Sequence, residues 1–500
     1  MIKKHKRLFI FLFFLFTSTI ILLFTSKCSP LYPFNDWVDI NAFFTVGKSI
    51  TRGILPYRDI FEQKGPILYF LFTLGYLISH KSFIGIFIFE IINFVCLSYL
   101  IYKIANLYVK EKSSLLIVPI MLTIIATCSS FVHGGSAEEF SLCLYILPLY
   151  YFLKHFKKQE LTNKELLILG IGASILLQTK YTLLGIYIGF CIALLIDMLT
   201  KKELKKLFKY ILFFFIGFMI PTILLLIYFV LTHSLTEYLY VYYYINITKY
   251  PVIDISLPRR IYKIVLTFGY GFLNSSLAIV ILYALIIPSL IVLHKKEYKL
   301  NILLLIICAF SAVGIYGGLI KHAYYFLPLS IFIIFSLVLI FFLLEKVLLK
   351  KYALSLVIIT IICLVSSYFF ANYKEFMFKD KKDLFQYKFA EIINEDEEAT
   401  LLEIGLLDPG VYTVTGLFPS TYYFETQNID YSLYPNILDS LNSYINNKEV
   451  KYIVFFTASG IEPTIYNYPN LLTNYEIVLQ SKSTFEGYDA DEMLLRVKED

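Results

Sequence analysis

The sequence predicts a multi-pass α-helical membrane protein with about eleven transmembrane helices and a small C-terminal α/β domain. Apolar residues make up 58% of the 500-residue chain, charged residues make up 16%, and the mean hydropathy is +0.69. A soluble core cannot hide that much apolar surface. Apolar stretches long enough to cross roughly 30 Å of hydrocarbon recur from residue 8 to about residue 371 and then stop.

The charged residues divide at the same border. Residues 372–500 contain 10 Lys or Arg and 22 Asp or Glu, which leaves 34 and 16 for residues 1–371. We therefore expect a basic membrane domain over residues 1–371 and an acidic soluble α/β domain over residues 372–500. An acidic soluble domain excludes nucleic acid as a partner, because that partner needs a clustered basic face.

The chain begins with a basic segment, residues 1–7, followed by the apolar residues 8–24. No cleavage pattern of small residues follows, so we expect an uncleaved first helix with a cytoplasmic amino end. Further spans are expected near residues 83–104, 114–132, 139–153, 165–179, 181–197, 209–231, 270–293, 300–319, 325–344 and 353–371.

Lysine clusters occur on every second connection between these spans: Lys103–Lys112, Lys154–Lys158, Lys201–Lys206, Lys295–Lys299 and Lys346–Lys351. The positive-inside rule assigns that side to the cytoplasm. An odd number of spans then places the C-terminal domain outside a bacterial cytoplasmic membrane. The outer loops would be residues 26–82, 133–138, a turn at Lys180, 232–269 and 320–324.

The seven cysteines lie mostly within apolar runs and show no metal-ligand spacing. The C-terminal domain has none, so we expect no disulfide framework and no metal site. No cofactor is implied with certainty, and a requirement for a divalent cation stays open.

The first outer loop, residues 26–82, is the longest and the richest in charge. Across residues 39–52, apolar residues oppose a polar row at helical spacing: Asn41, Thr45, Lys48 and Arg52. This pattern is typical of a helix lying in the membrane interface, with Asp39 as its N-cap. Residues 67–79 are apolar but too short to span.

The outer loops contain several short motifs that we interpret as one set. They are Asp39, Gly53-Ile-Leu-Pro-Tyr-Arg-Asp59, Lys64-Gly-Pro66, Gly134-Gly-Ser-Ala-Glu-Glu139, Lys180 and Lys321-His-Ala-Tyr-Tyr325. With these motifs the sequence resembles bacterial members of the C-type (GT-C) membrane glycosyltransferase superfamily, which includes protein O-mannosyltransferases and the lipid A aminoarabinose transferase. The resemblance implies an inverting transfer of a sugar from a polyprenyl-phosphate carrier. Relatives carry Asp-Glu where this chain has Asp39-Ile40, so Asp36 stays open as the catalytic acid.

Candidate site residues follow partly from the resemblance and partly from charge. The acceptor hydroxyl needs a base, for which Asp39, Glu138 and Glu139 are the candidates. The resemblance adds Asp59, Lys64, Lys180, His322 and Tyr325 as substrate-binding residues. Four of the six arginines lie in outer loops, where the positive-inside rule disfavours cations: Arg52, Arg58, Arg259 and Arg260. Because a guanidinium holds phosphate through paired hydrogen bonds, we expect Arg58, Arg259 and Arg260 to bind the lipid phosphate.

Each of these residues also has a purely structural interpretation. Asp39 could only cap its helix, and Arg58 with Asp59 could be a loop salt bridge. The acids at 138 and 139 could be a solvated pair, Arg259 and Arg260 could anchor lipid headgroups, and His322 could satisfy a helix end.

The function predicted is transfer of a sugar from a polyprenyl-phosphate carrier to an acceptor on the outer face of the membrane. The acceptor could be a cell-envelope glycan, teichoic acid, a lipid or a protein, and membrane lipid surrounds the enzyme. The alternatives are a transporter or flippase, and a polysaccharide polymerase or ligase that handles polyprenyl-linked glycans. Transporters concentrate ionisable residues and broken helices at mid-membrane, whereas the polar groups here concentrate in outer loops.

Overall fold

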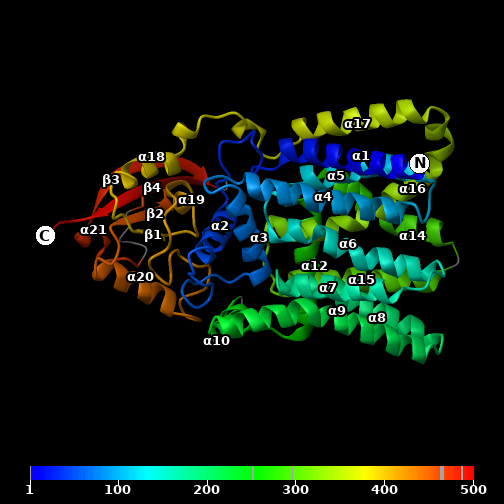
Figure 1. The fold of residues 1–500 in the computed structure, drawn as a ribbon, viewed down its shortest axis with the longest axis horizontal. Coiled ribbons are helices and arrows are strands. Elements are labelled where there is room, and N and C mark those ends of the chain that lie inside the picture. The colour runs from blue at the N-terminus through cyan, green and yellow to red at the C-terminus, as the bar shows by residue number, and fades with distance from the viewer. Residues whose placement is uncertain (1, 251–252, 296, 462–466, 486–487, 500) are drawn as a thin grey trace. The chain divides into compact units, whose positions relative to one another are not determined.

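The computed structural model describes residues 2–250, 253–295, 297–461, 467–485 and 488–499 (Figure 1). Two compact units share the chain. The helical unit comprises Met1–Leu31, Phe87–Ile227 and Ile253–Glu375. The mixed unit comprises Tyr32–Ile86, Tyr228–Val252 and Phe376–Asp500. The first outer loop therefore belongs to the same compact unit as the C-terminal segment, although the two are far apart in the sequence.

The helices of the helical unit lie in the segments where the hydropathy predicts spans. They are α1 (Ile2–Thr25), α4 (Ile84–Ala105), α5 (Glu111–Thr127), α6 (Ala137–Phe156), α7 (Asn163–Leu177), α8 (Gly185–Thr200), α9 (Leu204–Leu231), α12 (Leu257–Leu273), α13 (Leu277–Ala284), α14 (Ile286–His294), α15 (Tyr298–Tyr316), α16 (Ile334–Lys350) and α17 (Tyr352–Phe369). Short 3-10 segments join some of them: η1 (Ser129–Phe131), η2 (Tyr181–Leu184) and η4 (Ala323–Ile333).

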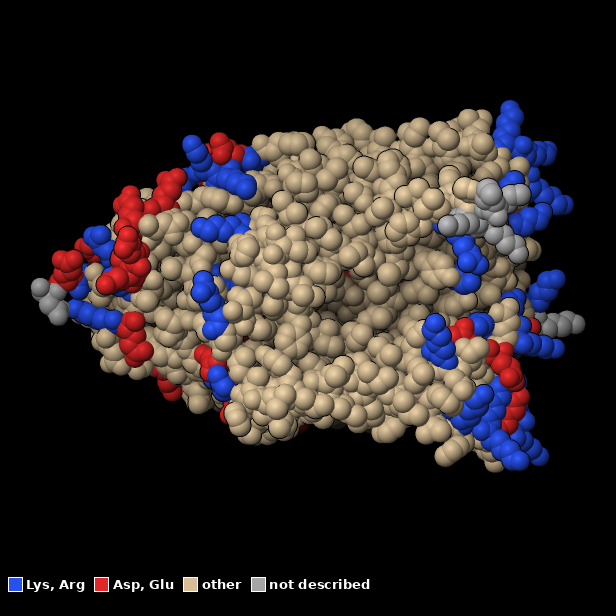
Figure 2. All heavy atoms as spheres, viewed as in Figure 1, with Lys and Arg blue, Asp and Glu red and all other residues tan. Residues whose placement is uncertain are grey.

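Within the described residues, seven helices are long and apolar enough to cross a membrane, or eight if the bent pair α13 and α14 forms one span. The sequence predicts about eleven spans. The difference arises partly because α5 and α7 have only 17 and 15 residues. Figure 2 shows the matching surface on the visible face: a broad uncharged zone over the helices and basic side chains gathered at one end of the bundle.

The helices pack closely where small residues meet. A Cβ added at Gly189 of α8 would come within 2.8 Å of the Ile307 backbone of α15, and one at Gly185 would overlap the Phe310 carbonyl. Small residues let membrane helices approach in this way. The antiparallel pair α8 and α15 is therefore held in one register, with the end of α8 beside the start of α15.

The mixed unit combines first-loop helices, a tyrosine-rich segment and a four-stranded sheet. Its helices are α2 (Val38–Ile50), α3 (Pro66–Ile78), α10 (Leu235–Tyr238), the π-helix η3 (Leu239–Ile245), α11 (Asn246–Thr248), α18 (Phe385–Ile393), α19 (Val411–Thr415), α20 (Asn436–Asn446) and α21 (Leu471–Asn474), with the short 3-10 turns η5 (Lys374–Phe376) and η6 (Lys381–Asp383) before α18. Its strands are β1 (Leu401–Ile404), β2 (Tyr452–Ala458), β3 (Tyr475–Phe485) and β4 (Tyr488–Val497).

The sheet has the strand order β1-β2-β4-β3. Strands β1 and β2 are parallel, whereas β4 pairs antiparallel with both β2 and β3. Strand β1 is buried along its whole length, as expected for an apolar strand covered on both faces. This sheet with α18 and α20 confirms the small α/β domain predicted for the C-terminal residues.

Helix α2 corrects the expectation of a helix lying in the membrane interface. Every residue from Val38 to Ser49 is buried, including the polar row. Its apolar face packs on α3, where Gly47 lies against the backbone of Phe72. The N-cap is Trp37 without a side-chain bond, so Asp39 lies in the first turn rather than at the cap. There the positive end of the helix dipole stabilises the negative charge of Asp39.

The segment expected as an outer loop over residues 232–269 is largely helical in the structure. It contains α10, η3 and α11, and α12 begins at Leu257 with a proline in its first turn. The tyrosines of this segment differ in exposure: Tyr238 and Tyr242 are buried, whereas Tyr240 and Tyr244 are exposed.

Candidate active site

The first-loop turn is built around one tyrosine. Tyr57 is fully buried and has a positive φ of 72°. A positive φ is unusual for a residue with a Cβ. Its ring contacts Tyr69, Phe229 and Tyr238 at centroid distances of 5.9, 5.9 and 5.7 Å. Its hydroxyl donates to the Lys64 carbonyl at 2.6 Å. The turn therefore holds the Lys64 segment against aromatic rings rather than leaving it in water.

Glu62 is the buried acid of this turn, and its place in the motif suggests either a salt bridge in the loop or a contact with carrier or sugar. Its carboxylate is 3% exposed and accepts hydrogen bonds from the Tyr69 hydroxyl and from the Lys64 backbone N–H. Burial raises the pKa of Glu62, and the Lys64 ammonium, 3.7 Å from its carboxylate, opposes this rise.

Asp39 lies in the same neighbourhood. It is 8% exposed, and its charge acts on both Glu62 and Glu425, whose pKa values it helps to raise. The Lys64 ammonium lies 5.4 Å from the ring centroid of Phe43, one turn further along α2. The structure therefore brings together Asp39, Glu62 and Lys64, a carboxylate pair beside a cation.

Arg58 and Asp59 form a fork-shaped ion pair. The Arg58 Nε and Nη2 atoms donate to the two Asp59 oxygens, both at 2.8 Å, and Nη1 donates to the Thr232 carbonyl at 2.9 Å. Asp59 also accepts from the Leu55 backbone N–H. Burial would raise the pKa of Asp59, but its bonds to Arg58 and Leu55 lower it overall. This geometry supports a structural role in the loop, and phosphate binding by Arg58 stays a prediction.

The polar row of α2 contacts the C-terminal segment. Thr45 donates to Asp408 at 2.6 Å, Thr413 donates to Asn41 at 2.9 Å, and the Lys48 ammonium donates to the Tyr412 carbonyl at 2.5 Å. These three bonds join α2 to residues more than 360 positions away. The helix that carries Asp39 is thus positioned by α19 and the loop before it.

Three buried carboxyl groups surround this junction: Glu403, Asp408 and Glu425. Burial raises the pKa of all three. Lys48 is their buried cation, and burial lowers its pKa to about 7 although Asp408 and Glu403 oppose the change. Three buried acids therefore face one buried lysine, so the lysine compensates only part of the cost of burying their charge.

In the helical unit, four predicted residues meet. The Lys180 ammonium, at the turn before η2, lies 2.5 Å from Glu138 in the first turn of α6. It also lies 4.0 Å from the ring centroid of Tyr325, and the His322 ring lies 5.4 Å from the same ring. Glu138 and Lys180 are both buried, so their ion pair is shielded from water.

Glu139 points to a different partner. The carboxyl group of Glu139 interacts with that of Glu90, a buried acid of α4, rather than with Lys180. Ser26 donates to Glu90 at 2.8 and 2.9 Å, and the Gly135 N–H donates to Glu139 at 2.6 Å. Gly134 has a φ of 84°, and a Cβ there would overlap Ser26 and Glu90. Ser26 and the glycine turn therefore hold the two acids, and the Oε1 atom of Glu139 is buried without a hydrogen-bond partner among the described residues.

The two remaining arginines behave differently from each other. Arg260 donates to the carbonyls of Gly317 at 3.0 Å and Ile253 at 2.6 Å, so it ties α12 to the end of α15. Arg259 is exposed. A cavity of about 90 Å³ lies in the same unit, lined in part by His322, Lys321 and Tyr316.

The structure therefore divides the candidates into two groups, one in each unit. Asp39, Arg58, Asp59 and Lys64 lie in the mixed unit, while the acids at 138 and 139, Lys180, Arg259, Arg260, His322 and Tyr325 lie in the helical unit. Among the described residues, no group of three or more His, Cys, Asp or Glu is arranged to hold a metal ion.

Comparison with known proteins agrees with this architecture. Residues 63–228 match the family model of dolichyl-phosphate-mannose-protein mannosyltransferase. No curated protein matches the sequence. The fold resembles the crystal structure of ArnT from Cupriavidus metallidurans bound to undecaprenyl phosphate, with a TM-score of 0.60, 9% identity and 98% of each chain covered. The apo structure of the same ArnT matches with a TM-score of 0.60, 9% identity and coverage of 99% of this chain and 98% of that one.

The protein is thus an integral membrane protein with the fold of the C-type glycosyltransferases over nearly its whole length. The family match covers residues 63–228, and the ArnT fold extends over nearly the whole chain. Both findings agree with the superfamily predicted from the outer-loop motifs.

Proposed function

We propose that the protein transfers a sugar from a polyprenyl-phosphate carrier to a cell-envelope acceptor on the outer face of the bacterial cytoplasmic membrane. The observation that carries the proposal is the set of buried ionisable groups in the first loop, Asp39, Glu62 and Lys64, within a C-type glycosyltransferase fold. The solved ArnT of the same fold binds undecaprenyl phosphate, which supports the carrier class.

In the proposed reaction, a carboxylate accepts the proton of an acceptor hydroxyl while the oxygen attacks the anomeric carbon of the sugar. The bond from that carbon to the carrier phosphate breaks, and its electron pair leaves with the phosphate. A single displacement of this kind inverts the configuration. We assign the base to Asp39, which is buried, lies at the amino end of α2 and has Glu62 close by.

A lysine near the departing phosphate would stabilise the charge that develops there. Lys64 and Lys180 are the candidates, because each is held beside a buried carboxylate and aromatic rings. A low-dielectric site strengthens such charge interactions. We propose that the C-terminal domain lies outside the membrane, as the lysine pattern predicts.

The test uses the purified full-length protein in sealed proteoliposomes, undecaprenyl-phosphate sugars with a labelled sugar, and a cell-envelope extract. We expect the label to move from the carrier to an envelope acceptor with the wild type, and this movement to be lost in Asp39→Asn. Glu138→Gln and Glu139→Gln test the other two candidate bases. Label that crosses the membrane while still joined to its carrier would instead support a flippase and contradict the proposal.

A further inference from the structure

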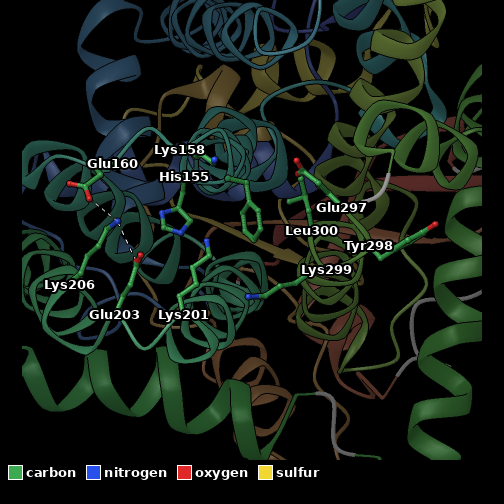
Figure 3. Close-up of a pocket in the computed structure, with 11 residues that line it drawn as sticks. His155, Lys158, Glu160, Lys201, Glu203, Lys206, Glu297, Tyr298, Lys299 and Leu300 are labelled. Atoms are coloured by element: carbon green, nitrogen blue, oxygen red, sulfur yellow. Dashed lines mark ion pairs between the residues drawn. The ribbon is translucent and has the colours of Figure 1, made fainter.

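A second polar cavity opens at the end of the helical unit that the lysine pattern assigns to the cytoplasm. Its volume is about 590 Å³, within the range of small-ligand pockets. The ends of α6 and α8, the start of α9, the start of α15 and the connection after α6 form its walls (Figure 3). The candidate active-site residues are absent from its lining.

A fully buried aspartate lies beneath this cavity. Asp197, in the last turn of α8, has an exposed fraction of 0%. The Lys201 ammonium lies 2.7 Å from one of its oxygens, and the Lys299 ammonium lies 2.7 Å from the other. The His155 Nε2 atom lies 3.0 Å from the first oxygen. An ionisable group placed inside a membrane helix is expensive unless it is paired, and it often marks a functional site.

The two lysines carry more positive charge than the aspartate neutralises. Two ammonium groups share one carboxylate, which leaves about one positive charge where Lys201 and Lys299 meet. Their side chains are 44% and 42% exposed although the aspartate is buried, so both ammonium groups reach the cavity. Figure 3 shows the two lysines converging from different helices.

Acidic residues in the lining limit the charge of a ligand. Lys206 is paired with Glu160 at 3.0 Å and with Glu203 at 3.4 Å, and Glu297 and Lys158 also line the cavity. Three carboxylates would repel a nucleotide triphosphate or another polyanion. A single phosphate group matches the excess positive charge at Lys201 and Lys299.

Lys201 and Lys299 lie close together before any ligand binds, because they lie at the adjacent ends of the packed helices α8 and α15. Close packing at Gly185 and Gly189 fixes α8 against α15. This contact places Lys299 of α15 beside Asp197 in the last turn of α8. Lys299 also donates to Thr200. A site held in this way loses little conformational entropy when a ligand binds.

We propose that this cavity binds one phosphate group through Lys201 and Lys299, carried either by a phospholipid headgroup or by free phosphate. Basic pockets between membrane helices at the cytoplasmic side are suited to lipid headgroups. Phe156, Tyr298 and Leu300 in the same lining add apolar surface for the part of a lipid next to the phosphate. The proposal is independent of the transfer reaction, since none of its residues belongs to the candidate active site.

The experiment measures binding to the full-length protein in a non-ionic detergent by native mass spectrometry. The probes are dioleoyl phosphatidylglycerol and dioleoylglycerol, which share acyl chains and differ in phosphate, and inorganic phosphate is tested by competition. We expect phosphatidylglycerol to bind and dioleoylglycerol not to bind at this site. Displacement by millimolar inorganic phosphate would identify free phosphate as a ligand, whereas no displacement would identify the lipid headgroup.

Variants locate the binding in the cavity. Lys299→Gln should weaken phosphatidylglycerol binding about ten-fold, because one of the two positive charges that attract the phosphate is lost. Lys202→Gln is the matched control, since Lys202 is exposed in the same turn but does not line the cavity. If Lys201→Gln impairs folding, Lys299→Gln alone decides the question. Equal losses in Lys299→Gln and Lys202→Gln, or equal binding of both lipids to the wild type, would overturn the proposal.

Discussion

The buried lysine of α2 makes a prediction about pH that can be worked through from the structure. Burial lowers the pKa of Lys48 to about 7, whereas an unfolded lysine titrates near 10.5. Between these two values the unfolded state binds a proton that the folded state does not bind. The free energy of opening this region therefore rises with pH, and the lysine contributes full destabilisation only below about pH 7.

The size of the effect follows from the two pKa values. One pKa unit corresponds to about 1.4 kcal/mol. Integrated from pH 7, where the folded lysine is half protonated, to pH 9, the gain is about 2 kcal/mol. Lys48→Met removes this term together with the hydrogen bond to the Tyr412 carbonyl. The difference in opening free energy between wild type and variant should thus grow by about 2 kcal/mol over that interval.

Hydrogen–deuterium exchange of α2 and α19 at pH 7, 8 and 9 measures the local opening free energy directly. Lys388→Met is the control, because Lys388 is an exposed lysine of the same unit. A wild-type minus variant difference that stays constant within about 0.5 kcal/mol from pH 7 to 9 would refute this account of Lys48.

Three further predictions concern the candidate site. Asp39→Asn should leave the protein folded and inserted but abolish transfer, since asparagine keeps the size and removes the base; near-normal transfer would move the base to another acid. Lys180→Met should destabilise the helical unit by about 3–5 kcal/mol by leaving Glu138 buried and unpaired, and adding Glu138→Gln should restore much of it in thermal unfolding. Arg58→Lys should loosen the first loop in exchange measurements, because lysine cannot make the forked bond to Asp59. If Arg58→Lys weakens turnover at limiting carrier without loosening the loop, the residue binds phosphate instead.

The sequence by itself determined the class of the protein and most of its elements. Hydropathy and the spacing of lysines are local properties, and they predicted a polytopic helical protein with a small C-terminal α/β domain. The outer-loop motifs are read directly from neighbouring residues, and the family they suggested agrees with the fold.

Only the tertiary structure decided which charged residues are buried and with whom they pair. The polar row of α2 was expected to face the membrane interface, but it contacts residues near 410 through bonds such as that from Thr45 to Asp408. Glu138 and Glu139 are adjacent in the sequence yet pair with different partners, Lys180 and Glu90. A pKa shift or a buried ion pair depends on desolvation and on groups brought close by folding across long stretches of chain. No local pattern carries that information. An acid has the same sequence neighbours whether folding leaves it in water or brings it against a lysine from a distant part of the chain.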